Sequence, residues 1–477
     1  MEHKIFSGST WGKVRDLSQE GEGIVALKSP DPELDGRVAF IPGLIPGDVI
    51  EAEEITTKGK RVRVDRYQLL ELSQDRQEAF CEHFPECGGC QLQEMKYEAS
   101  LRWKTKRVAD SLTRIAKLDY VEDILEPCQG LAEPYGFRSI VQLRNDREAR
   151  LGFYRRGSKQ VLAQNYCPIQ SEAFNEIRDY LHTLLRQLVS SELVKLEQIE
   201  MRQDAAASNF LLHFDFNAPI ITDDWQDLMT QLIDFMTETY GPESLSLWLE
   251  DPEYIYHPYG ETKLICHENG LELRYSANSF QQTNIKQNAV LYREICKFAE
   301  LALIKRKSSQ CLDYKLGYDK EWDNNSGTVT TDTDNLKILE LYSGVGSISL
   351  NLAKALPQAQ VLGVEINRQA VLDSLDNAAL NWLPEDRVCF KHQDAARYLH
   401  CLIKKEQAQD FDLLVVDPPR QGLGKELCQD IVVSGIDHVL YVSCDPASLA
   451  RDIAQLNSAY RLERVQPIDM FPWMTHV

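Results

Sequence analysis

The sequence predicts an α/β fold whose C-terminal part holds a parallel sheet, preceded by a small β-barrel and a central α+β unit. After residue 285 strands and helices alternate, as in KILELY, SISLNLAKAL, VLGVEI, RQAVLDSLDNAAL and DLLVVD, which is typical of βαβ units. Short strands punctuated by Gly and Pro near the N-terminus favour a barrel. Segments such as SIVQLRN, NFLLHFDF and SLSLWLED lie between these two parts and predict a mainly antiparallel sheet.

A chain of 477 residues is too long for one core, and about 150 residues per domain predicts roughly three domains. We expect a barrel over 1–67, a central domain over 75–275 and the parallel-sheet domain over 276–477. Helical spacing predicts helices near 93–118, 171–189 and 222–240, and the first of them could pack against the C-terminal domain. The polar, aperiodic stretch 306–335 predicts a mobile insertion.

Composition limits the location and the partners of the chain. No apolar run approaches the roughly 20 residues that cross a bilayer, and no secretion signal begins the chain, so we expect a cytoplasmic protein without a membrane span. Its 12 cysteines are then expected to be thiols or metal ligands. The net charge of −21 disfavours nonspecific binding of nucleic acid. Local basic clusters could still contact phosphates, although a run of charges is more often only a solvated face. They comprise Arg102, Lys104, Lys106, Arg107 and Arg114, and then Arg138, Arg144, Arg147, Arg150, Arg155, Arg156 and Lys159.

A cofactor site is predicted where the strand KILELY runs into Ser343-Gly344-Val345-Gly346-Ser347 and a helix. Glu365 ends the next strand about 20 residues later, where it could accept hydrogen bonds from ribose hydroxyls. Ser349 replaces the third glycine of the dinucleotide fingerprint, so an adenosine cofactor such as S-adenosylmethionine fits better, although a dinucleotide stays possible. Asp394 and Asp417 follow the next two strands at the same edge of the sheet, where each could alternatively just cap a helix.

Two cysteine patterns stand apart from the other thiols. Cys444 ends the strand HVLYVSC at the same edge as the cofactor loop, beside a helix N-terminus that would favour a thiolate, although such a cysteine is often only part of a core. Cys81, Cys87 and Cys90 lie within ten residues, and Gly88-Gly89 permit the tight turn that lets them converge. With a fourth thiol they would suit zinc or an iron–sulfur cluster, and spacing alone slightly favours zinc.

Four motifs together are similar to the RNA uracil-5-methyltransferase family, in the order of that family. They are Ser279-Phe280-Gln281-Gln282-Thr283-Asn284, Leu341-Tyr342-Ser343-Gly344-Val345-Gly346, Asp417-Pro418-Pro419-Arg420 and Ser443-Cys444-Asp445-Pro446. The resemblance covers nearly the whole chain. It implies a Rossmann-like methyltransferase domain, apparently lacking its last strand, with an N-terminal TRAM-like, OB-type β-barrel and a central α+β domain that binds a cluster and RNA.

The resemblance also implies roles for single residues. Cys444 would be the nucleophile, and Cys167 would join Cys81, Cys87 and Cys90 as the fourth ligand of a [4Fe-4S] cluster, with zinc as the alternative. S-adenosylmethionine would be bound by Gln282, Tyr342, Ser347, Glu365, Asp394 and Asp417. The expected partner is RNA, ribosomal 23S RNA rather than transfer RNA, and the expected state is a monomer.

Chemistry explains the need for the thiol, because C5 of uracil is too weak a nucleophile to take a methyl group unaided. Addition of a thiolate at C6 makes an enolate, and a base must later remove the C5 proton. Reaching the ring requires an unstacked uridine.

The chain departs from the family pattern at two places. Asp445 replaces the usual asparagine beside Cys444, and its negative charge should disfavour the thiolate. The closing motif Met470–Val477 stops just before the glutamate that serves as the family's base. An alternative hypothesis is therefore a catalytically impaired or truncated RNA-binding iron–sulfur homologue. Methylation of an exocyclic amine is a third possibility, which the Asp-Pro-Pro motif favours but which leaves Cys444 without a role.

Overall fold

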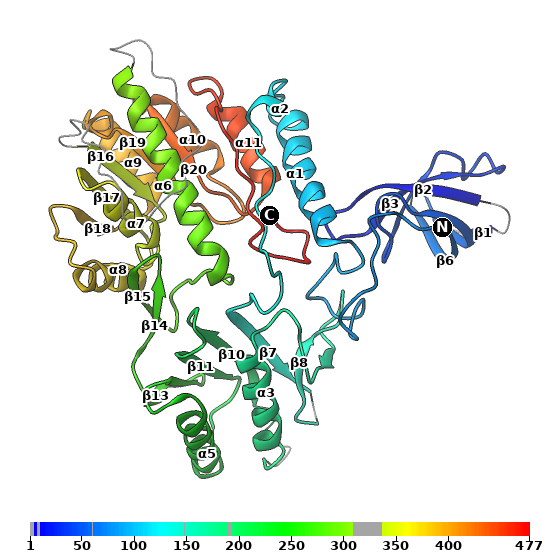
Figure 1. Ribbon diagram of the computed structural model, residues 1–477, viewed down its shortest axis with the longest axis horizontal. Coiled ribbons are helices and arrows are strands. Elements are labelled where there is room, and N and C mark those ends of the chain that lie inside the picture. Colours follow the sequence, from blue (N-terminus) through cyan, green and yellow to red (C-terminus); the bar gives the residue numbers. More distant parts are fainter. Residues whose placement is uncertain are drawn as a thin grey trace.

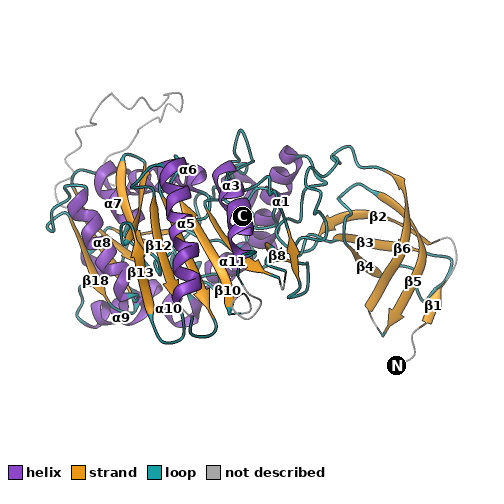
Figure 2. Ribbon diagram, turned by 90° about the horizontal axis from the view of Figure 1, so that it is seen from below, coloured by secondary structure: helices purple, strands orange, loops and turns teal. Residues whose placement is uncertain are grey.

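The computed structural model describes residues 4–6, 10–59, 61–146, 148–188, 193, 195–220, 222–308 and 336–477. Three bodies follow one another, with the N-terminal barrel standing at one end of the molecule (Figures 1 and 2). Most of the predicted insertion 306–335 lies outside the described residues.

The N-terminal body is a closed barrel. Its strands are β1 (Lys4–Phe6), β2 (Thr10–Leu17), β3 (Gly23–Lys28), β4 (Val38–Ile41), β5 (Val49–Lys58) and β6 (Arg61–Glu71). The order β5-β2-β3-β4-β6 returns to β5, and β1 pairs with Ile55–Thr57 near the end of β5. Alternate residues point inward, as in β2, so that Val14, Val25 and Ile50 form a small apolar core. Closure leaves few unpaired edges, which stabilises a small sheet.

The central body is a seven-stranded sheet covered on one face by two helices. Its elements are β7 (Ile140–Asn145), β8 (Leu151–Tyr154), β9 (Val161–Ala163), α3 (Glu172–Leu185), β10 (Leu196–Gln203), β11 (Phe210–Phe216), α5 (Thr222–Tyr240), β12 (Leu245–Glu250) and β13 (Ile255–Tyr259). The strand order is β13-β12-β11-β10-β7-β8-β9, antiparallel except for β11 and β12, which are parallel because α5 connects them. Leu212, Phe214 and Trp225 pack between β11 and the helices in the core of this body.

The C-terminal body is a doubly wound α/β domain. It comprises the hairpin β14 (Lys263–Glu268) and β15 (Leu271–Ser276), then α6 (Ile285–Ser308), β16 (Leu336–Leu341), α7 (Ser347–Ala355), β17 (Ala359–Glu365), α8 (Arg368–Leu380), β18 (Val388–His392), α9 (Ala395–Lys404), β19 (Leu413–Val416), α10 (Gly424–Val433), β20 (His438–Tyr441) and α11 (Pro446–Leu456). The sheet is parallel, with the order β18-β17-β16-β19-β20. The strand order reverses beside β16, and ligands bind at such switch points in open α/β sheets.

The two faces of the parallel sheet carry separate apolar cores. Ile338 of β16 faces the core shared with α6, α7 and α8, whereas its neighbour Leu339 faces the core shared with α9, α10 and α11. Helix α1 (Tyr97–Arg114) joins the second core through Val108 and Leu112 and packs against α11, as Figure 1 also shows. A short helix, α2 (Val121–Ile124), follows α1. A segment early in the chain therefore completes a face of the C-terminal domain.

Candidate active site

The glycine loop after β16 presents open backbone at the switch point. Gly344 and Gly346 have φ of +54° and +85°, which disfavours other residues, and a Cβ on Gly346 would lie 2.7 Å from Phe390. The backbone N–H of Gly344 donates to Glu365 Oε2 at 3.0 Å, and that of Asn367 donates to Oε1 at 2.7 Å. Two backbone donors thus fix the carboxylate of Glu365 at the end of β17, beside the loop.

Polar groups beneath the loop are buried, and one of them has no partner. The Oγ of Ser343 is buried without a hydrogen bond among the described residues, so it is available to a ligand. Ser347 begins α7, and its Oγ lies 3.4 Å from the hydroxyl of Tyr275. Burial raises the pKa of Glu340 to about 8, although Ser349 hydrogen-bonds to its carboxyl group. An adenosine cofactor fits these donors and the open loop.

The remaining predicted cofactor residues lie in different settings. Tyr342 has a φ of 68° and packs against the α9–α11 side of the sheet, and burial raises its pKa to about 12. Burial also raises the pKa of Asp417, at the end of β19, to about 7. Asp394 is exposed and accepts a hydrogen bond from the N–H of Arg397 at 2.8 Å, so it caps α9 as the alternative interpretation expected. Gln282 is half-buried, and its carbonyl accepts from Ser139 Oγ at 3.4 Å.

Cys444 lies between β20 and α11, half-buried rather than sealed in a core. Burial raises the pKa of its thiol, the guanidinium of Arg420 lowers it, and the carboxylates of Asp417 and Asp445 raise it further. Asp445 is also the N-cap of α11, since its Oδ1 accepts from the N–H of Ser448 at 2.7 Å. The thiol therefore shares its surroundings with Asp417, which belongs to the cofactor edge.

The other four predicted cysteines line a single cavity. Cys81, Cys87, Cys90 and Cys167 line it together with Arg138. Burial raises the pKa of Cys90 to about 12, with the Cys167 and Cys87 thiolates adding to the rise.

Comparisons with known proteins agree with this geometry. Residues 321–477 match the family model described as tRNA (uracil-5-)-methyltransferase. An uncharacterized RNA methyltransferase of Halalkalibacterium halodurans is 31% identical over 97% of this chain and 94% of that protein. The chain belongs to the RNA uracil-5-methyltransferase family. A further relative, an uncharacterized RNA methyltransferase of Clostridium acetobutylicum, is 27% identical over 97% of this chain and 94% of its own.

A solved structure shares the complete fold of this methyltransferase. The crystal structure of Pyrococcus abyssi tRNA (uracil-54, C5)-methyltransferase in complex with S-adenosyl-L-homocysteine aligns with a TM-score of 0.65 and 20% identity. The alignment covers 98% of both chains. The predicted fold class is confirmed, including the closed barrel of OB type. In the part of the chain that the structure describes, no helix is long and apolar enough to cross a bilayer.

Most basic residues of α1 form ion pairs within the methyltransferase, and one that was expected to be available to phosphates is buried. Lys104 is fully buried and pairs with Asp469. Lys106 pairs with Asp16 and Asp110, and Arg102 pairs with Asp75. The hydrophobic spacing of the helix indicates one buried face, but only the tertiary structure puts Lys104 on it.

Sequence reasoning missed several polar residues beneath the cofactor loop. Glu340, Tyr275 and Glu268 are buried there, and Tyr275 donates to Glu268 Oε1 at 3.3 Å. The sequence contained one signal for these residues, the charged Glu340 inside the apolar strand KILELY. A carboxyl group buried in a strand requires polar partners nearby.

Proposed function

We propose that the protein transfers the methyl group of S-adenosylmethionine to C5 of a specific uridine in RNA, through a covalent bond between Cys444 Sγ and C6 of the uracil. The main support for this proposal is the position of Cys444. It is half-buried and lies with Arg420 and Asp417 at the edge of the sheet that holds the glycine loop. The nucleophile and the methyl donor must both reach the same uracil ring. The thiol and the glycine loop proposed to bind the donor lie at this one edge of the sheet. We further propose 23S ribosomal RNA as the substrate class.

Several residues of this chain would hold S-adenosylmethionine, the methyl donor. S-adenosylmethionine supplies an electrophilic methyl group. We propose that Glu365 accepts from its ribose, that Asp394 binds its adenine edge, and that the other donor contacts come from Gln282, Tyr342, Ser347 and Asp417. The unpartnered Oγ of Ser343 supports a polar ligand at this place.

Cys444 would act in the chemical sequence as nucleophile and then as leaving group. Its thiolate adds to C6, and the electron pair of the C5–C6 bond moves toward C5 and the C4 carbonyl oxygen. C5 then attacks the methyl carbon, whose bond to the sulfonium sulfur breaks, and S-adenosylhomocysteine is the leaving group. Removal of the C5 proton by a base returns the electron pair to the C5–C6 bond and expels the thiolate. The guanidinium of Arg420 assists the first step, because it lowers the pKa of the thiol.

We also propose that Cys81, Cys87, Cys90 and Cys167 hold a [4Fe-4S] cluster. Four thiolates around one zinc ion at about 2.3 Å would lie about 3.8 Å apart. All four thiols line one cavity, and the family resemblance favours a [4Fe-4S] cluster over one zinc ion. The cavity is bordered by apolar side chains such as Phe84, Phe153 and Ile169, which would shield a cluster from water.

The cluster site would then have a structural role near the active site. The N–H groups of Gln91 and Leu92, just after Cys90, donate to the carbonyl of Trp473 at 2.9 and 3.0 Å. The carbonyl of Met470 in turn accepts from Asn284 in the Gln282 segment at 3.1 Å. These bonds connect the cysteine loop with the segment proposed to bind the donor.

We propose three units acting as a monomer in the cytoplasm: a TRAM-like barrel, a central RNA-binding domain and a methyltransferase domain, predicted at 1–67, 75–275 and 276–477. Strand β6 extends the barrel to Glu71, and the hairpin β14–β15 packs with the methyltransferase domain. The barrel exposes Trp11, with the ammonium of Lys28 4.6 Å from its ring, and Phe40, which supports stacking on RNA bases.

The test is covalent trapping with RNA that contains 5-fluorouridine, since the fluorine on C5 cannot leave as a proton and the adduct persists. Denaturing electrophoresis of wild-type protein with this RNA and S-adenosylmethionine should show a slower band that Cys444→Ala loses. Cys401→Ala, a partly exposed cysteine on α9, serves as the control and should keep the band. Equal mobility of wild type and Cys444→Ala would refute the nucleophile.

Labelled S-adenosylmethionine with 23S ribosomal RNA and with transfer RNA separates the other hypotheses. Label in 5-methyluridine after digestion to nucleosides supports the proposal, and the RNA that carries it identifies the substrate class. Label on an exocyclic amine indicates the third possibility, whereas RNA binding without any transfer indicates the impaired homologue.

A further inference from the structure

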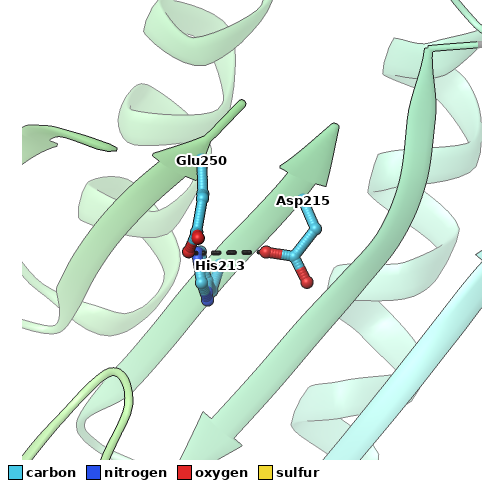
Figure 3. Close-up of side chains that lie close together, drawn as sticks. All are labelled: His213, Asp215 and Glu250. Carbon is cyan, nitrogen blue, oxygen red and sulfur yellow. Dashed lines mark ion pairs between the residues drawn. The ribbon is translucent and has the colours of Figure 1, made fainter. Parts of the chain in front are cut away.

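Three ligand-type side chains converge on the central sheet, away from both sites described above. The Nε2 of His213 lies 3.2 Å from Asp215 Oδ1 and 3.2 Å from Glu250 Oε2. One ligand atom of each residue lies within 4.8 Å of the others, and Figure 3 shows the three side chains turned toward one another. No other such group of three His, Cys, Asp or Glu residues occurs in the described part of the chain.

Strand register brings these residues together. His213 and Asp215 are two residues apart on β11 and therefore share one face, opposite to Leu212 and Phe214, which face the helices. Glu250 of the parallel neighbour β12 is the direct partner of Asp215. Like charges at directly paired positions destabilise a sheet unless a cation compensates them. Among the described residues neither carboxylate forms an ion pair with a lysine or an arginine.

His213 supplies the independent observation that a ligand belongs here. Its side chain is 8% exposed and its Nε2 has no hydrogen-bond partner among the described residues, although it faces both carboxylates. Ligands at about 2.1 Å from a metal, with angles slightly above 90°, lie about 3.0–3.2 Å apart. The observed separations of 3.2 Å match that spacing.

One imidazole and two carboxylates suit a divalent ion of the manganese, iron(II) or zinc type. The other oxygen of Asp215 accepts a hydrogen bond from the side chain of Gln198 on β10, and such outer contacts orient metal-binding carboxylates. The side chain of Glu250 is 39% exposed, so water can complete the coordination. Leu211, two residues before His213, packs into the core of β14 and β15, so the ligands lie on the face turned toward the catalytic domain.

We propose that His213, Asp215 and Glu250 form a binding site for a divalent transition-metal ion on the central sheet, separate from the cysteine cavity. The ion would neutralise the paired carboxylates and fix β11 against β12. This inference does not depend on the identity of the methylated base.

The test uses Mn²⁺, because oxygen and nitrogen ligands suit it whereas the thiolates of the cysteine cavity do not. Titration of the purified full-length protein, followed by the electron paramagnetic resonance of free Mn²⁺, should reveal one site that the double variant Asp215→Asn/Glu250→Gln weakens by at least about tenfold. The matched control is Glu253→Gln, an exposed acid in the turn after β12, which should bind as wild type does.

A direct readout removes dependence on the folding of the variants. Pulsed electron paramagnetic resonance of the wild-type complex should show coupling of Mn²⁺ to one imidazole nitrogen, and His213→Gln should abolish that coupling. Absence of the nitrogen coupling in wild type, or equal affinity of wild type and the double variant, would overturn the proposal. In the presence of chelator the double variant should melt no lower than wild type, because it relieves repulsion between the paired carboxylates.

Discussion

The buried ion pair between Lys104 and Asp469 ties the C-terminal segment to α1, and its removal gives a strong prediction. Both side chains are 0% exposed. The ammonium of Lys104 also donates to the carbonyl of Phe471 at 2.9 Å, and the hydroxyl of Tyr97 donates to Asp469 Oδ2 at 2.8 Å. In Lys104→Met the buried carboxylate of Asp469 would keep only one hydrogen-bond donor to stabilise its charge, the hydroxyl of Tyr97.

The expected cost follows from this burial. Removing one partner of a buried pair costs about 3–5 kcal/mol, because the remaining charge stays desolvated. That is a large share of a typical free energy of unfolding of about 5–15 kcal/mol. Lys106→Met is the control on the same helix, since Lys106 is 51% exposed and exposed pairs contribute about 0–1 kcal/mol.

Urea unfolding followed by circular dichroism, with Lys104→Met, Asp469→Asn and the double variant, measures the effect. The double variant should lose less than the sum of the single variants, because neutralising Asp469 removes the unpaired charge, with a coupling of about 1–3 kcal/mol. If Lys104→Met unfolds within about 0.5 kcal/mol of wild type, the argument from burial is wrong.

Two further predictions concern the active site and the cysteine cavity. Asp445→Asn removes a negative charge that raises the pKa of Cys444, so the pKa of the thiol falls and more thiolate forms at neutral pH. The rising limb of the pH profile of adduct formation should therefore move to lower pH, while asparagine still caps α11. An unmoved or upward-shifted profile would contradict the assigned charge effect. Cys167→Ser should lower the iron content of anaerobically purified protein and its visible absorbance, whereas Cys401→Ser should leave both unchanged; equal iron in the two variants would exclude Cys167 as a ligand.

Local patterns in the sequence were sufficient to predict the main helices and the parallel sheet. The predicted helices 171–189 and 222–240 correspond to α3 (Glu172–Leu185) and α5 (Thr222–Tyr240). The alternation of strands and helices also predicted the parallel sheet and the edge at which Glu365, Asp417 and Cys444 lie. These features depend on hydrophobic periodicity and on the rule that parallel strands end at one edge, both of which are local.

The sequence by itself determined the succession of barrel, central sheet and parallel sheet, and it marked the glycine loop and the thiols. Only the tertiary structure decided that Lys104 is buried, because Asp469, its partner, lies 365 residues further along the chain. It also decided that His213 and Glu250 converge, since the pairing register of β11 and β12 is set across an intervening helix. Contacts between distant segments depend on how whole elements pack, and periodicity along the chain carries no information about that packing.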